Sequence, residues 1–168
     1  MVTGSRLEFN AAPPYNPRRL VMTVSREDRR ADVEEWLRAP GLGEPVKDNR
    51  VRSVHLWKGL YVKRFKYPTF LQKLRGRLAD KALREFRILG ALHARGLEVP
   101  EPVAWARDGA STVLFTREIP GARTLRSVPL TRPLLRDLAL FVRRLHDAGL
   151  RDDDLHIGNV LLADGKLH

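Results

Sequence analysis

Two polar side chains near the C-terminus have the spacing that a phosphate-transfer loop requires. Asp154 and Asn159 are separated by four residues and lie between an amphipathic segment and an apolar one. In phosphotransferases, an Asp at the first position orients or deprotonates the acceptor hydroxyl, and an Asn at the second binds a magnesium ion. A polar turn between a helix and a strand uses the same residue types for ordinary turn reasons. The spacing alone leaves both interpretations open.

Phosphoryl transfer also needs a lysine at the nucleotide phosphates and a carboxylate that holds this lysine. Lys63 lies in Leu60–Phe65, the predicted second strand of a hairpin that begins at Val51. Glu85 lies in a predicted helix from Ala79 to about His93, flanking its apolar stripe, so it points toward the sheet. We expect Glu85 to hold Lys63, because a buried ammonium needs a partner. Taken singly, each residue could equally be an ordinary exposed side chain.

Further elements must position these residues. The patterns predict a helix from Ser25, as its cap, to about Leu37; strands on both sides of Asp108-Gly109; a helix over Arg132–His146; and a strand over Asn159–Ala163. In the helix over Arg132–His146 we expect six buried side chains: Leu134, Leu135, Leu138, Phe141, Val142 and Leu145.

The predicted fold class is α+β. Ile119-Pro120-Gly121 breaks regular structure and marks a boundary between lobes. We predict an N-terminal arm with a short helix over residues 1–48, a small antiparallel β-sheet lobe with one helix over 49–118, and an incomplete, mainly helical lobe over 119–168.

Composition restricts the possible partners. The chain has 168 residues and no cysteine, which excludes disulfides and thiolate metal sites. It has neither an apolar run long enough to span a bilayer nor an evident secretory signal, so we expect a cytoplasmic protein. The net charge of +11 predicts an anionic partner. Nine Lys or Arg face only two acids between Lys63 and Arg87.

In chain order, Tyr61-Val62-Lys63, Ala82–Phe86, Val99–Val103 and the segment Asp154–Leu162 resemble the protein-kinase-like superfamily. Leu145–Leu150 together with this last segment is most similar to the lipopolysaccharide kinases that act on the Kdo or heptose sugars of the inner core. The resemblance covers roughly residues 50 to 168.

The resemblance implies ATP and Mg²⁺ as cofactors and assigns residue roles. Lys63 would bind the α- and β-phosphates and Glu85 would hold Lys63. Asp154 would be the catalytic aspartate and Asn159 a magnesium ligand. Glu118 lies in the interlobe segment whose main chain would meet adenine. For His156 we favour a local hydrogen bond within the loop.

The resemblance also has departures. No glycine-rich phosphate loop precedes Lys63, although residues 49–55 could still fold over a nucleotide. Family members continue beyond the position of His168 into a second, Asp-containing metal motif. We therefore expect a C-terminally truncated kinase, and little or no phosphotransferase activity from these 168 residues.

The implied acceptor is an anionic lipopolysaccharide precursor resembling Kdo-lipid A, met at the cytoplasmic face of the inner membrane. Basic residues with interleaved apolar ones suit a peripheral contact with that surface; they are Lys66, Lys73, Arg75, Arg77 and Lys81 with Phe65, Tyr67, Phe70, Leu71 and Leu74. Three alternatives stay open: a kinase for another small molecule or a protein, a regulatory remnant without catalysis, and a basic nucleic-acid-binding module. The last has no recognisable motif.

Overall fold

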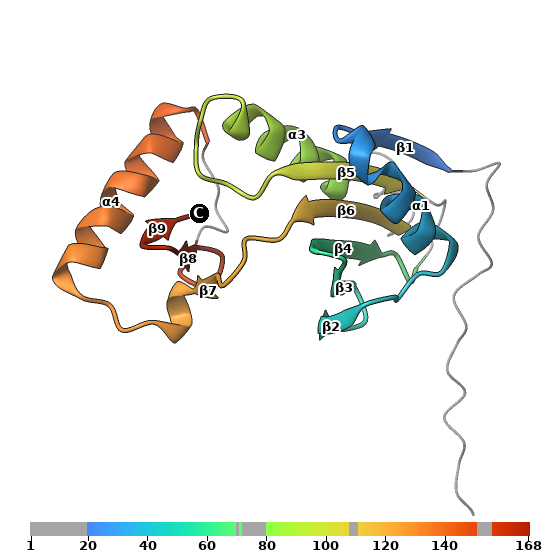
Figure 1. Ribbon diagram of the computed structural model, residues 1–168, viewed down its shortest axis with the longest axis horizontal. Coiled ribbons are helices and arrows are strands. Elements are labelled where there is room, and N and C mark those ends of the chain that lie inside the picture. The colour runs from blue at the N-terminus through green and yellow to red at the C-terminus, as the bar shows by residue number, and fades with distance from the viewer. Residues whose placement is uncertain (1–19, 70, 72–79, 108–110, 151–155) are drawn as a thin grey trace, which may run out of the picture.

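The computed structural model of the chain describes residues 20–69, 71, 80–107, 111–150 and 156–168. In chain order (Figure 1), the elements are β1 (Val21–Val24), η2 (Glu27–Arg29), α1 (Arg30–Arg38), β2 (Glu44–Asp48), β3 (Arg52–Trp57), β4 (Leu60–Lys66), α3 (Lys81–His93), β5 (Pro102–Arg107), β6 (Ser111–Arg117), β7 (Arg123–Thr124), η3 (Leu125–Ser127), α4 (Arg132–Asp147), β8 (Leu161–Ala163) and β9 (Lys166–Leu167). None of the helices in these ranges is long and apolar enough to cross a membrane.

A six-stranded antiparallel sheet forms the larger part of the fold. Its strand order is β1-β5-β6-β4-β3-β2, so β4, which carries Lys63, lies in the interior of the sheet. The predicted turn between β3 and β4 is confirmed: Lys58 and Gly59 both have positive φ values, 48° and 70°, as a two-residue hairpin turn requires. The α+β class with an antiparallel sheet is confirmed as well.

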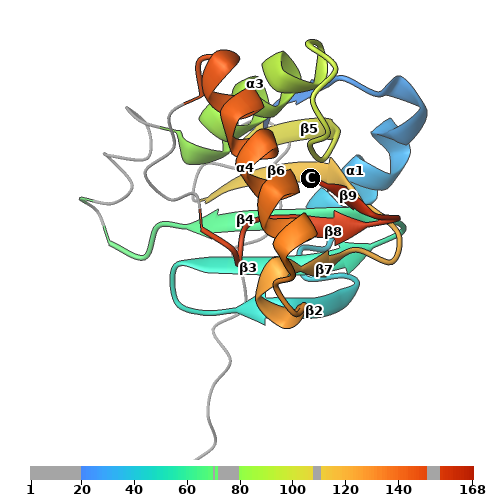
Figure 2. The same ribbon diagram turned by 90° about the vertical axis from the view of Figure 1, so that its left-hand side faces the viewer.

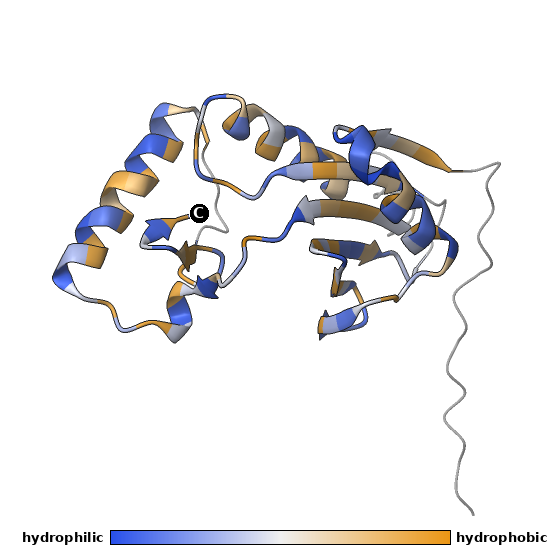
Figure 3. Ribbon diagram, in the orientation of Figure 1, coloured by the Kyte–Doolittle hydropathy of each residue, from blue (hydrophilic) through white to orange (hydrophobic). Residues whose placement is uncertain are grey.

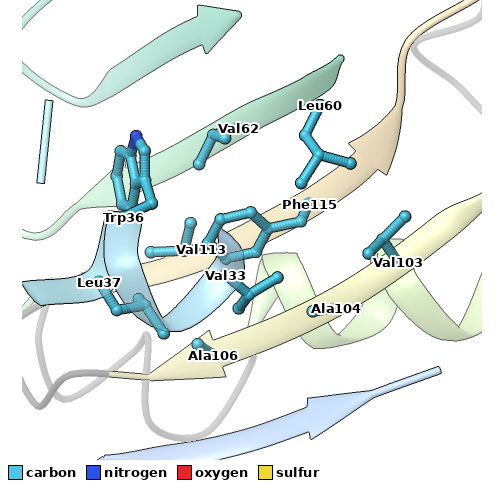
Figure 4. Close-up of a cluster of buried hydrophobic side chains, with 10 residues drawn as sticks. All are labelled: Val33, Trp36, Leu37, Leu60, Val62, Val103, Ala104, Ala106, Val113 and Phe115. Carbon is cyan, nitrogen blue, oxygen red and sulfur yellow. The ribbon is translucent and has the colours of Figure 1, made fainter. Parts of the chain in front are cut away.

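Helix α1 covers one face of the sheet. Its buried side chains Val33, Trp36 and Leu37 pack against apolar residues of β4, β5 and β6 (Figure 4). The ring of Trp36 meets Phe115 edge to face at 5.7 Å, and its Nε1–H donates to the carbonyl of Leu42. This cluster fixes β4 from the side opposite to α3.

The expected start of this helix was wrong. Ser25 does not cap it, because the Ser25 hydroxyl donates to the carbonyl of Val103 at 2.9 Å and so ties the end of β1 to β5. A 3-10 turn follows, and α1 begins only at Arg30.

Helix α3 covers the other face. The Asp80 side chain caps it by accepting from the N–H of Leu83 at 3.0 Å, and the same carboxylate is bound by Arg107 of β5 at 2.7 Å. Ala82 of α3 packs with Trp105 and Leu114 of the sheet. Cap, ion pair and apolar contact together fix the position of α3 relative to the strands.

The C-terminal part contains α4 and a three-stranded sheet of β7, β8 and β9. Figure 2 shows α4 lying across this small sheet. Polar and apolar segments alternate along α4 (Figure 3), and its Phe141 and Leu145 are buried in a cluster with Leu125 and Val160. The expectation of a buried Leu135 was wrong, since 46% of it is exposed.

Residues 118–122, between β6 and β7, belong to no strand or helix, as Ile119-Pro120-Gly121 predicted. The strands β1 and β2, both before residue 49, pair with β5 and β3 in the large sheet. The division into residues 1–48, 49–118 and 119–168 stays a prediction.

Candidate functional site

Lys63 occupies the middle of β4 and faces α3. Its neighbours across the sheet are Val54 of β3 and Leu114 of β6. Cross-strand partners lie on the same face of a sheet. Leu114 packs against α3, so the row Val54, Lys63 and Leu114 lies on the face that this helix partly covers.

The expected contact between Lys63 and Glu85 is present. The Lys63 ammonium lies 2.7 and 2.8 Å from the two carboxylate oxygens of Glu85. The side chains are 25% and 36% exposed. An ion pair that solvent reaches in this way adds only about 0–1 kcal/mol to stability, so its main effect is to fix the ammonium in one position.

Tyr61 lies two residues before Lys63 on the same strand, and therefore on the same face. Burial raises the pKa of the Tyr61 hydroxyl, and the negative charges of Glu118 and Glu44 raise it further. Tyr61, Leu56 and Val54 are all half-buried. Beside Lys63 there is thus a partly open surface with apolar character, bordered by two carboxylates.

Glu118 lies at the end of this surface. Its main-chain N–H donates to the carbonyl of Gly59 at 2.9 Å, so that donor is occupied within the protein. A methyl group at Gly59 would lie 3.9 Å from the Glu118 carboxylate, which places this side chain beside the β3–β4 turn. Any contact of Glu118 with a nucleotide base stays a prediction.

Only part of the predicted catalytic loop lies in the described residues. Asp154, like Asp152, lies outside the described residues. Asn159 is exposed and directly precedes the buried Val160, and its N–H donates to the carbonyl of His156 at 2.8 Å. The His156 Nδ1 accepts from the N–H of Gly158 at 3.0 Å, which is the local bond expected for this histidine.

No group of three or more His, Asp or Glu side chains that could hold a metal ion occurs in the described parts of the chain. The amide oxygen of Asn159 is a hard ligand of the kind that Mg²⁺ accepts, and a carboxylate such as Asp154 would be a suitable second ligand. The magnesium site stays a prediction.

The turn between β2 and β3, residues 49–51, contains no glycine. The Asn49 side-chain oxygen stabilises this turn, because it accepts from the N–H groups of Val51 and Arg52 at 3.0 and 2.8 Å. This turn was not predicted from the sequence, and neither was Tyr61 as part of the site. A usable signal for Tyr61 existed, because every second residue of the Lys63 strand must share its face.

Two cavities occur elsewhere in the described parts. The larger, of about 680 Å³, lies between α4 and β9, and the smaller, of about 470 Å³, borders the interlobe segment and includes Glu118. Neither is lined by Lys63, Glu85 or Asn159. The predicted site residues Lys63 and Glu85 are partly exposed.

Comparison with known proteins identifies relatives. The lipopolysaccharide kinase (Kdo/WaaP) family matches residues 26–167. A 3-deoxy-D-manno-octulosonic acid kinase of Vibrio cholerae is 32% identical, over 50% of this chain and 39% of that protein. The protein of the same name from Actinobacillus succinogenes is 30% identical, over 51% of this chain and 40% of that protein. The match thus spans about two fifths of the length of each relative.

Proposed function

We propose, on the premise that the chain belongs to the lipopolysaccharide kinase (Kdo/WaaP) family, that it forms the nucleotide site and catalytic loop of an ATP-dependent kinase. The proposed acceptor is a hydroxyl of a Kdo sugar in the lipopolysaccharide inner core. The observation that carries the proposal is the Lys63–Glu85 pair, in which strand and helix hold an ammonium in a defined position. The names of the relatives support the acceptor.

In the proposed reaction, Lys63 binds the phosphates of ATP, and Glu85 keeps the Lys63 ammonium in place before the nucleotide arrives. Tyr61, Leu56 and Val54 offer half-buried surface suited to a planar base beside these phosphates. Glu118 borders the same surface from the interlobe segment. These residues fit a nucleotide with its base toward Glu118 and its phosphates toward Lys63.

Asp154 would accept the proton of the sugar hydroxyl or orient that hydroxyl toward the γ-phosphate. Asn159 would be a ligand of Mg²⁺, which, when bound, neutralises charge on the phosphate oxygens. The buried Val160 and the pairing of β8 with β7 and β9 support the position of Asn159. The loop would thus present Asp154 to the acceptor and Asn159 to the metal.

The acceptor is anionic, which suits a chain with a net charge of +11. Kdo carries a carboxylate and lipid A carries phosphates, so a basic protein gains affinity at such a surface at moderate ionic strength. We place the protein as a peripheral protein at the cytoplasmic face of the inner membrane. Half of the ten basic and apolar residues expected to contact lipid lie outside the described residues.

The test of the acceptor measures binding. Vesicles containing Kdo-lipid A should retain the chain better than vesicles of lipid A whose charge is matched with anionic phospholipid. Equal retention would show that Kdo is not recognised and would overturn the acceptor. Equal retention on neutral phosphatidylcholine would remove the membrane surface from the proposal. Calorimetry must also detect ATP binding, without which the kinase function itself falls.

A further inference from the structure

The turn between β2 and β3 lies at the end of the sheet toward which Lys63 points. The Lys63 ammonium is 5.3 Å from the ring centre of Phe65, the next residue on the same face, and Phe65 pairs with Arg52 at the start of β3. A glycine-rich turn here could bind phosphate oxygens with its backbone N–H groups. In this chain the N–H groups of Val51 and Arg52 are bound by the Asn49 side chain. Those two donors are not available to an anion.

Cationic side chains are present at this place instead. Lys47 of β2 pairs with Val54, and Val54 pairs with Lys63, so the two lysines lie in one row on one face. With strands about 4.8 Å apart, their Cα atoms are about 10 Å from each other. Lys47 is exposed. Its ammonium can therefore reach an anion bound at Lys63 from the other side of Val54.

Arg52 adds a guanidinium one step further along the same face. It is half-buried and lies opposite Phe65, the ring that the Lys63 ammonium approaches. A guanidinium can bind two phosphate oxygens at once through its fork of N–H donors. Lys47, Arg52 and Lys63 thus border one area of the sheet from three neighbouring positions.

The opposite face of the same strands shows a different charge arrangement. There Lys66 of β4 forms an ion pair with Asp48, and Arg64 donates to the hydroxyl of Ser111 at 2.8 Å. Neither Lys47 nor Arg52 forms an ion pair within the described ranges. Like charges near one another disfavour the folded state unless an anion neutralises them. Among the cations of β2, β3 and β4 named here, the two without an ion pair in the described ranges, Lys47 and Arg52, lie on the face that carries Lys63.

We propose that Lys47 and Arg52 form a side-chain polyphosphate clamp, which replaces a glycine-rich backbone loop for the nucleotide bound at Lys63. The proposal rests on the proposed function and extends it to two residues to which no role was assigned from the sequence. The clamp acts on the β- and γ-phosphates, since these are the groups that extend beyond the base and ribose toward the β2–β3 turn. AMP lacks the β- and γ-phosphates, so the clamp should not affect its affinity.

The test compares the affinities of the chain for ATP, ADP and AMP by isothermal titration calorimetry. Lys47→Ala and Arg52→Ala should each weaken ATP binding about tenfold and change AMP binding less than about twofold. Each should also reduce the salt dependence of ATP binding, because one charge contact is lost. Lys47→Arg should keep the affinity. Arg38→Ala on α1, also an exposed cation, is the matched control.

The outcomes separate the clamp from the kinase function. If ATP binding depends on Lys63 but is unchanged in Lys47→Ala and Arg52→Ala, the clamp is wrong and the proposed function stands. If AMP binding falls as much as ATP binding, the residues act on the fold or on the nucleoside, and the clamp is again wrong. If the unsubstituted chain binds no ATP, both proposals fail. Circular dichroism and thermal melting show whether each variant is folded.

Discussion

The Lys63 ammonium on β4 contacts both carboxylate oxygens of Glu85 on α3, at 2.7 and 2.8 Å, across a sequence separation of 22 residues. The contact requires that β4 lies in the interior of the sheet and that α3 is fixed by its cap and by Arg107. The Lys63–Glu85 contact therefore depends on the local fold, and the proposed nucleotide site depends on this contact.

We expect Lys63→Ala to weaken ATP binding more than about tenfold, because a charge-assisted contact with phosphate is lost. The free energy of unfolding should change by less than about 1 kcal/mol, since the ion pair is reached by solvent. Calorimetry and urea denaturation measure the two effects. Lys166→Ala removes another exposed ion pair, with Glu98, that involves neither Lys63 nor Glu85, and it should leave ATP affinity unchanged. A large loss of stability in Lys63→Ala would show that the pair is structural.

The pKa of Tyr61 is raised by burial and by Glu118 and Glu44, so its hydroxyl stays protonated at a pH where a free tyrosine ionises. Because the pKa of Tyr61 is higher in the folded than in the unfolded state, the protonated hydroxyl contributes to the stability of the fold. This contribution is complete below about pH 10 and is lost as the pH rises through the raised pKa. An absorbance titration should show one tyrosine that ionises at a higher pH than a free tyrosine, and this ionisation should be missing in Tyr61→Phe.

Glu118→Gln supplies the check on this assignment. Removing the charge should lower the pKa of Tyr61 toward its ordinary value, because the carboxylate disfavours a nearby phenolate. Glu98→Gln removes a carboxylate for which no effect on Tyr61 is seen and should not shift the titration. An unchanged curve in Glu118→Gln would place its carboxylate away from Tyr61.

Asn159→Ala should remove the gain in ATP affinity that Mg²⁺ brings, while the affinity for ATP in EDTA stays within about twofold. The reason is that Asn159 is assigned to the metal and not to the nucleotide. Titrations of ATP with and without Mg²⁺ measure the difference. His156→Ala is the control, since its ring is engaged with the N–H of Gly158. A full Mg²⁺ effect in Asn159→Ala would exclude this ligand.

Gly43, which leads into β2, allows a stability prediction with a close control. It has a φ of +92°, and a Cβ there would lie 2.2 Å from the carbonyl oxygen of Leu56. Gly41 has a φ of +105° and nothing within 4 Å of such a Cβ. Both alanine variants incur the backbone strain of about 1–3 kcal/mol, and only Gly43→Ala adds a clash. Urea denaturation should rank Gly43→Ala as the less stable, and equal losses would contradict the close contact.

The sequence predicted best those elements whose signals are local. The β3–β4 hairpin has its Lys58-Gly59 turn, and α3 has its stripe and terminal Gly96, so Lys63 and Glu85 could be paired in advance. The pairing of β1 with β5 joins segments about 80 residues apart, and no local pattern announces it. Every residue of β2 is exposed, so its sequence lacks the alternation of apolar and polar residues that marks a strand.

Side-chain competition accounts for other differences. Ser25 looked like a helix cap, but the carbonyl of Val103 takes its hydroxyl once β1 and β5 are paired. Leu135 continues the leucine pattern of α4, yet only part of that helix surface contacts the small sheet in the described chain. The Asn49 turn is local, since its side chain accepts from N–H groups two and three residues further on, but β2 was not predicted as a strand and so no hairpin was expected there.

A shift of register in β2 determines which way Lys47 points. The register of β2 against β3 shifts between Pro45 and Lys47, so that Glu44 and Lys47 both pair with residues of the Lys63 face although they are three positions apart. Without this shift, Val46 would pair with Val54, and the alternation of the strand would turn Lys47 to the opposite face. The register of this edge strand would thus determine whether a cation faces the proposed phosphate site, without altering any residue of the predicted catalytic loop.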